Sequence, residues 1–197
     1  MIQSLKIKFA APAGVKLTQS VCSLLHGVLM ENIDCDYADV LHTQSLRPYS
    51  QSFYFDRESN ALYWQLNALN AQAKDELLAA AFALPEKVLL RQKNMELQIV
   101  GKEYLPATDY EALAEKYFAH PLAGKYLHMH FLTSCAFKSE GKYVIFPQPQ
   151  FILGSLVKRW NACADSNKLE ALGVAQDLVQ EVYVADYRLR MQAFSVD

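Results

Sequence analysis

Hydrophobic and polar positions change their period along the chain, and this pattern predicts the order of the elements. Apolar residues alternate over 5–10, which predicts a strand, and recur at helical spacing over 17–29, which predicts a helix. The following segments predict a short helix, two strands, a helix that stops at Pro85 and two more strands: 37–42, 52–55, 62–66, 72–83, 87–90 and 97–100. The main order is β-α-β-β-α-β, that of the ferredoxin-like, or RRM-like, split βαβ unit.

A second copy of this order begins after residue 107, although no sequence repeat links the two halves. Its elements are a helix, a hairpin of two strands, a helix and a long final strand: 109–118, 126–132, 142–146, 151–160 and 182–194. We therefore predict an α+β fold of two tandem ferredoxin-like (RRM-like) domains, the first over 1–106 and the second over 107–197. We expect the second to be truncated, and so incomplete at its C-terminus.

Composition and charge narrow the class of protein. With 197 residues, 52% of them hydrophobic and 20% charged, the chain has the composition of a folded protein rather than a disordered one. Its net charge of -2 offers no general attraction to phosphate, so a nucleic-acid surface would have to be a local patch of Lys and Arg. The four cysteines lack Cys-x-x-Cys spacing, and no apolar run approaches the ~18 residues that span a bilayer. We expect a cytoplasmic protein without membrane association.

The segment 130–161 is the most informative part of the chain, because it joins a hairpin to a helix without interruption. An apolar strand leads into a Ser-Glu-Gly turn, a second strand returns, and a break with prolines starts an amphipathic helix. The segment has an aromatic pair near Phe-Pro and a helix end that reads Leu-x-x-Arg-Trp-Asn. It resembles the second half of the CRISPR precursor-RNA processing endoribonucleases, the sixth Cas family, of the RAMP superfamily.

The resemblance implies a metal-independent endoribonuclease without a cofactor, whose partner is CRISPR repeat RNA. It also allows CRISPR effector subunits or fused CRISPR adaptation modules as further partners. In the family, a Leu-His pair after the first helix contributes the catalytic histidine, which His42 matches here. Arg47 matches a basic residue that is often lysine, and His26 falls near a tyrosine or histidine of the first helix.

These residue types fit the chemistry that the resemblance implies. Cleavage by the ribose 2′-hydroxyl needs proton transfers, which histidine supplies near neutral pH, and stabilisation of charge on phosphate oxygens. His42 is the expected general base or acid, with His26 as its counterpart or positioner and Arg47 as a phosphate clamp. The implied products are a 2′,3′-cyclic phosphate and a 5′-hydroxyl.

Structural explanations stand beside each of these assignments. His26 lies at the margin of an apolar helix face, as a half-buried boundary residue would. His42 ends a short helix, where histidine interacts with the last carbonyls. Arg47 precedes Pro48 and fits a solvated loop position equally well.

Basic residues of the second half supply candidates for contacts with the RNA backbone. They lie in the hairpin, on the following helix and on the final strand: Lys138, Lys142, Lys158, Arg159, Arg188 and Arg190. The hairpin lysines also fit a role as solubilising residues of an exposed tip. His128 and His130 share one face of a predicted strand, where ordinary hydrogen bonds explain them better than a metal lacking a third ligand.

The chain departs from the family in one conspicuous feature, the glycine-rich segment near the C-terminus. Its seven glycines are scattered and form no Gly-x-Gly pair, so the backbone approach to phosphate that such a loop allows is missing. A second departure is Thr133-Ser134-Cys135, where the family more often has a Thr-Pro-Thr-like sequence. Two other functions remain open: a non-catalytic RAMP subunit that binds RNA in an effector complex, and a ferredoxin-like protein-interaction module.

Overall fold

The computed structural model describes residues 1–10, 17–119, 126–131, 135–166, 168–169 and 181–189. The chain divides into two compact units, Met1–Leu113 and Ala114–Asp197.

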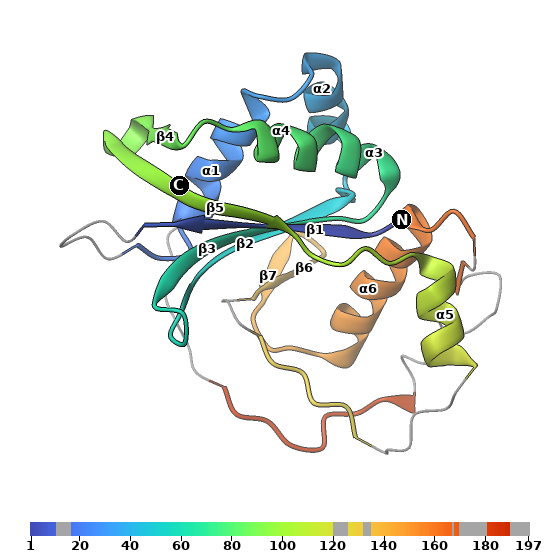
Figure 1. Cartoon of the computed structure of the whole chain (residues 1–197). Coiled ribbons are helices and arrows are strands. Elements are labelled where there is room, and N and C mark those ends of the chain that lie inside the picture. Colours follow the sequence, from blue (N-terminus) through green and yellow to red (C-terminus); the bar gives the residue numbers. More distant parts are fainter. Residues whose placement is uncertain (11–16, 120–125, 132–134, 167, 170–180, 190–197) are drawn as a thin grey trace. The chain divides into compact units, whose positions relative to one another are not determined.

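The first unit is built on a five-stranded antiparallel sheet with the strand order β2-β3-β1-β5-β4. Its strands are β1 (Gln3–Phe9), β2 (Tyr49–Asp56), β3 (Ala61–Ala68), β4 (Lys87–Leu90) and β5 (Met95–Tyr104). The helices are α1 (Val21–Met30), α2 (Cys35–Thr43), α3 (Ala71–Ala73) and α4 (Ala79–Ala83), and they cover one face of the sheet (Figure 1).

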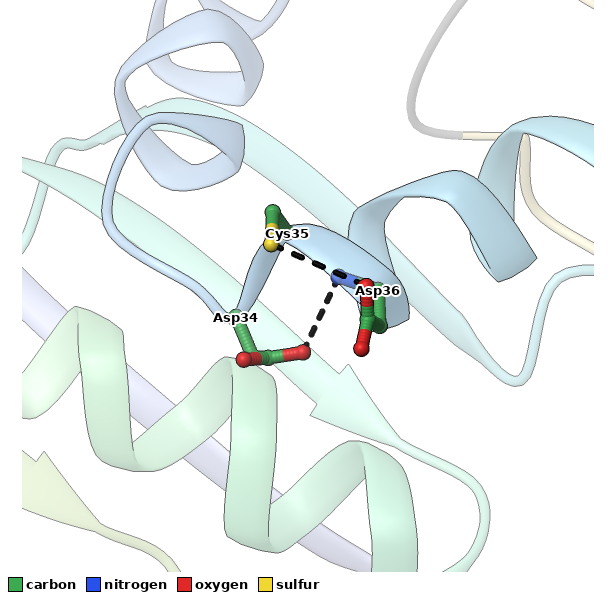
Figure 2. A group of neighbouring side chains, drawn as sticks. All are labelled: Asp34, Cys35 and Asp36. Atoms are coloured by element: carbon green, nitrogen blue, oxygen red, sulfur yellow. Dashed lines mark hydrogen bonds between the residues drawn. The ribbon is translucent and has the colours of Figure 1, made fainter.

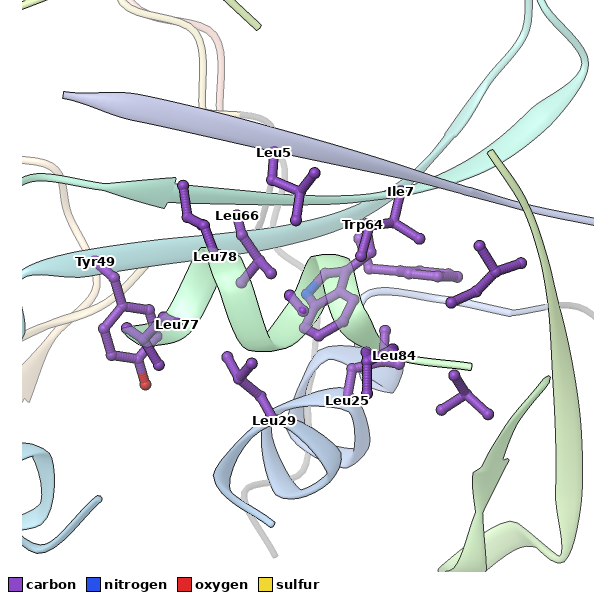
Figure 3. Close-up of a cluster of buried hydrophobic side chains, with 14 of the residues drawn as sticks. Leu5, Ile7, Leu25, Leu29, Tyr49, Trp64, Leu66, Leu77, Leu78 and Leu84 are labelled. Carbon is purple, nitrogen blue, oxygen red and sulfur yellow. The ribbon is translucent and has the colours of Figure 1, made fainter. Parts of the chain in front are cut away.

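Alternation along the strands creates the core between sheet and helices. On β1, Leu5, Ile7 and Phe9 are buried, while the residues between them face away. Figure 3 shows Leu5 and Ile7 beside Trp64, with Leu25 of α1 among the side chains of the same cluster. Each such side chain contributes about 1.5–3 kcal/mol by leaving water, so α1 is held firmly on the sheet.

The predicted helix over 72–83 is interrupted. Asn70 begins it, because its side chain accepts a hydrogen bond from the Ala73 N–H at 2.8 Å. A π-helical segment, η1 (Lys74–Leu78), then lies between α3 and α4. The sequence contains no signal for it, because a π turn changes the hydrogen-bond step without requiring different residue types.

The order of elements in the first unit agrees with the sequence prediction. Strands β2, β3, β1 and β5 have the neighbour relations of a split βαβ unit, and β4 extends the sheet as an edge strand beside β5. A short 3-10 helix, η2 (Arg91–Lys93), connects β4 to β5. The predicted α+β class is therefore confirmed.

The second unit contains a small hairpin and a longer helix. Strands β6 (Phe137–Ser139) and β7 (Lys142–Val144) are joined by Glu140 and Gly141, which both have positive φ, 50° and 77°. Helix α6 (Pro149–Cys163) starts with proline at its first turn, and Phe151 stacks on Phe137 with ring centroids 5.7 Å apart. The helix α5 (Tyr110–Phe118) crosses the division between the units.

Two predicted strands of the second half are wrong where the structure describes them. Residues 126–131 and 182–189 are exposed and have no regular secondary structure, and the first hairpin strand lies at 137–139 instead. The remaining predicted strand positions, 132 and 190–194, lie outside the described residues. An alternating pattern forms a strand only where a neighbouring strand offers backbone partners. The second ferredoxin-like domain and the boundary at 106/107 stay predictions.

Candidate active site

Helix α1 presents His26 at the edge of the core. Val21, Leu25 and Leu29 recur at helical spacing and are buried. His26 follows Leu25 by one position, which rotates its ring to the margin of the buried face and leaves it half-buried. The expectation of a boundary histidine thus describes its burial, but not its contacts.

Helix α2 presents His42 to solvent. The side chain of Asp34 begins this helix by accepting hydrogen bonds from the N–H groups of Asp36, at 3.0 Å, and Tyr37, at 3.2 Å. Tyr37 and Leu41 are buried, so His42, next after Leu41 and in the last turn, is exposed. The helix therefore fixes His42 by its backbone and leaves the imidazole accessible.

The strand after this helix, β2, brings Tyr49 into contact with His26. Tyr49 begins β2 on its buried side and is only 5% exposed. Its hydroxyl oxygen lies 2.8 Å from His26 Nε2, a hydrogen bond between residues 23 positions apart. This bond ties the start of β2 to the middle of α1.

Arg47 interacts with both members of this pair. Burial raises the pKa of the Tyr49 hydroxyl, while the charge of Arg47 and a hydrogen bond with its side chain act in the opposite direction. Arg47 is exposed as a residue, and the Tyr49 hydroxyl is a hydrogen-bond partner of its side chain.

The electrostatics of His26 show that the three predicted residues lie together. Burial lowers the pKa of His26, and the charges of Arg47 and His42 lower it further. Arg47 lies in the loop before β2, and His42 lies in the last turn of α2. Their charges act on His26 because the fold brings these segments close to α1. We call His26, His42, Arg47 and Tyr49 the histidine cluster.

The sequence analysis did not assign a role to Tyr49. It lies in the segment 41–50 that contains His42 and Arg47, at the start of a strand. Tyr49 and Phe53 both lie on the buried side of β2. This position indicates that Tyr49 has a hydrogen-bond partner, because a buried tyrosine hydroxyl needs one. The identity of that partner, His26, could not be predicted from the pattern.

The structure separates the predicted RNA-binding residues. Lys138 pairs with Tyr143 and Lys142 with Ser139, so the two lysines lie on opposite faces of the hairpin and both are exposed. On α6, Lys158 is exposed and Arg159 is half-buried. Arg188 is exposed, and Arg190 lies outside the described residues.

A group of metal-ligand side chains occurs at the start of α2, apart from these predictions. Asp34, Cys35 and Asp36 are neighbours and all exposed (Figure 2). The helix cap made by Asp34 accounts for its orientation. His128 and His130 do not belong to this group, and they lie in the segment 126–131, without the strand that would align them.

Among the described residues, no helix combines the length and the apolar character needed to cross a bilayer.

Comparison with known proteins finds Cas6 relatives. The model of the CRISPR-associated endoribonuclease Cas6 family matches residues 129–194. A CRISPR-associated endoribonuclease Cas6 of Mycobacterium tuberculosis is 31% identical over 176 residues, which cover 87% of this chain and 54% of that protein. A Cas6 of Streptococcus thermophilus is 26% identical over 183 residues, or 90% of this chain and 71% of that protein. Over most of its length the chain is therefore similar to Cas6 proteins.

Solved Cas6 structures have the same fold. A Cas6 product complex is 21% identical and has a TM-score of 0.70, with 98% of this chain and 80% of that chain covered. Thermus thermophilus Cas6 is 18% identical with a TM-score of 0.61, over 95% of this chain and 73% of that chain. The resemblance predicted from residues 130–161 and 41–50 is thus confirmed.

Two limits follow from these comparisons. The chain spans about half the length, 54%, of the Mycobacterium tuberculosis Cas6 proteins that it matches. The histidine cluster lies before the residues 129–194 that the Cas6 family model matches. The roles of its residues therefore rest on geometry and on the sequence resemblance.

Proposed function

We propose that this chain is a metal-independent endoribonuclease that cuts within CRISPR repeat RNA to generate guide RNAs. The observation that carries the proposal is the histidine cluster, in which two histidines and an arginine from separate elements converge. Similarity to Cas6 proteins supports the substrate class, because the curated relatives are named CRISPR-associated endoribonucleases.

The proposed reaction uses the ribose 2′-hydroxyl as nucleophile. A base takes the hydroxyl proton, the oxygen attacks the adjacent phosphorus, the bond from phosphorus to the 5′-oxygen breaks, and an acid protonates that oxygen. The products are a 2′,3′-cyclic phosphate and a 5′-hydroxyl. His42 is suited to exchange protons with the RNA, because its ring is exposed and its backbone is fixed by α2.

Arg47 is proposed to hold the scissile phosphate. A guanidinium stays charged at every relevant pH and can donate two parallel hydrogen bonds to phosphate oxygens. Arg47 is exposed, and its hydrogen bond to Tyr49 limits the freedom of the side chain. Such a preorganised cation stabilises the charge that develops on the phosphorane oxygens.

The basic residues of the second unit are proposed to contact the RNA backbone. Lys138 and Lys142 would reach different strands or different turns of a folded RNA, since they lie on opposite faces of the hairpin. Lys158, Arg159 and Arg188 would add further phosphate contacts, as would Arg190, which lies outside the described residues.

Cleavage of a labelled repeat RNA from the associated CRISPR array, in EDTA, tests the proposal. We expect one specific cut by the wild-type polypeptide, and a loss of at least roughly 100-fold in rate for His42→Ala, the size of a missing acid or base. RNA binding should persist in this variant, because the change removes no cation from the proposed phosphate contacts.

His128→Ala is the matched control, because His128 is also exposed but lies outside the histidine cluster. It should cut like the wild type. Binding without any cut by the wild type would favour a non-catalytic RNA-binding subunit. Absence of salt-dependent binding would favour a protein-interaction module.

A further inference from the structure

We propose that Tyr49 is a positioning residue that holds His26 in one neutral tautomer, with its Nδ1 protonated and its Nε2 occupied, and thereby leaves proton acceptance from the RNA to His42. The inference rests on the proposed function and deepens it, because the sequence and the reaction leave the roles of the two histidines interchangeable.

The argument begins with the short hydrogen bond between Tyr49 and His26. The two atoms are 2.8 Å apart, Tyr49 is 5% exposed, and His26 is half-buried. The rings also lie close, with centroids 6.3 Å apart. A hydroxyl in this position is held by its own ring in the core, so it is a fixed partner for the imidazole.

Arg47 determines the direction of this hydrogen bond. A guanidinium has donors and no acceptor, so the hydrogen bond between Arg47 and the Tyr49 hydroxyl uses the tyrosine oxygen as acceptor. A hydroxyl that accepts from a cation becomes a stronger donor, because hydrogen bonds in a chain polarise one another. With the Tyr49 oxygen accepting from Arg47, we infer that its O–H donates to His26 Nε2, 2.8 Å away.

The surroundings of His26 also favour its neutral form. The groups that face it are Arg47 from the loop, His42 from the end of α2 and Tyr49 from β2. Burial, Arg47 and His42 lower the pKa of His26, and this outweighs a hydrogen bond with its own backbone that raises it. A neutral imidazole that accepts at Nε2 carries its proton at Nδ1, and so can only donate from that nitrogen.

This arrangement distinguishes the two histidines. His26 has no nitrogen ready to take the 2′-hydroxyl proton while Tyr49 occupies Nε2, but its Nδ1–H can donate a hydrogen bond. His42 is exposed and is the one that can accept a proton from the RNA. Arg47, Tyr49 and His26 therefore position the cluster without accepting the 2′-hydroxyl proton.

Long-range ¹H–¹⁵N NMR of the histidine rings tests the tautomer directly, in wild-type protein and in Tyr49→Phe. The signals of His26 are those that disappear in His26→Gln. In wild type near neutral pH we expect protonation at Nδ1. Tyr49→Phe keeps the ring in the core but removes the hydroxyl, so Nε2 should gain proton occupancy, and the cleavage rate should fall roughly tenfold, as expected for one lost hydrogen bond.

Tyr54→Phe is the matched control. Tyr54 lies on the same strand, is half-buried, and donates its hydroxyl to Gln65 at 3.3 Å. It should change neither the His26 tautomer nor the cleavage rate. A wild-type His26 protonated at Nε2, or an unchanged tautomer in Tyr49→Phe, would overturn the proposal. If the tautomer behaves as expected but the wild type cuts no RNA, the proposed function fails while the role of Tyr49 stands.

Discussion

At the scale of the residue, His26 shows how burial and charge act together on one imidazole. Its ring is half-buried, bonded to Tyr49, and close to the charge of Arg47. Burial and the charges of Arg47 and His42 lower its pKa below the ordinary value of 6.5, against a smaller opposing effect of a hydrogen bond with its own backbone. A neutral histidine of this kind makes the stability of the protein depend on pH.

We predict that the free energy of unfolding falls with acidification and that His26 causes part of the fall. In the unfolded chain His26 binds a proton near pH 6.5, whereas in the folded protein it does so only at lower pH. Between these two values the unfolded state binds more protons, so stability rises with pH. The loss is complete below the folded-state pKa and absent well above 6.5.

Urea unfolding of wild type and His26→Gln, from pH 5 to 8, measures this contribution. The variant should have a shallower pH dependence below pH 7. His128→Gln, a change at an exposed position, should keep the wild-type slope. Equal slopes for all three proteins would show that His26 titrates as it does in the unfolded chain.

At the scale of the element, helix α1, which carries His26, contains a residue that lowers its stability. Gly27 follows His26 in the middle of this helix, is exposed, and would have no atom within 4 Å of an added Cβ. Glycine lowers helix stability because it loses more backbone freedom on folding. No contact of the described residues requires it there.

Gly27→Ala should therefore stabilise the protein by about 0.5–1 kcal/mol in chemical unfolding. Gly141→Ala provides the contrast. Its added Cβ also meets nothing within 4 Å, but its φ of +77° strains any L side chain, so this variant should be less stable than wild type. A less stable Gly27→Ala variant would show that an added methyl group at this position of α1 is unfavourable, contrary to the prediction.

At the scale of the whole molecule, the histidine cluster and the proposed RNA contacts belong to different units. Every residue of the cluster lies in Met1–Leu113, together with the core that supports it. The lysines and arginines predicted to contact RNA lie after residue 114. Each unit therefore makes a separate contribution to the proposed reaction.

A fragment of residues 1–119, which keeps α5 whole, should fold cooperatively and preserve the His26 tautomer seen by NMR. It should lose most of its affinity for repeat RNA, because the basic residues of the second unit are absent. Thermal unfolding, NMR and a binding titration measure the three properties. A fragment that binds RNA as tightly as the whole chain would place the RNA contacts in the first unit.

The sequence predicted the first unit well because its signals are local. Alternation over β1 and β3 and helical spacing over α1 specify each element from neighbouring residues alone. The strands expected at 126–132 and 182–194 had the same kind of pattern, but their described residues form no strand. Pairing between distant segments is not encoded in the pattern of one segment.

The candidate site divides in the same way. The Leu-His pair and the basic residue five positions later, His42 and Arg47, were apparent from the chain, because the resemblance depends on short motifs. His26 was named as a candidate whose burial fitted a structural role equally well. The hydrogen bond to Tyr49 gives His26 a specific partner, which no spacing could indicate.

By itself, the sequence determined the resemblance to Cas6 proteins, the α+β class and the order of elements in the first unit, because these follow from motifs and from periodicity within single segments. Only the tertiary structure decided that residues 26, 42, 47 and 49 converge and that Tyr49 forms a hydrogen bond with His26. Contacts across 23 residues depend on how α1 packs on the sheet, and that packing is a property of the whole core rather than of any one segment.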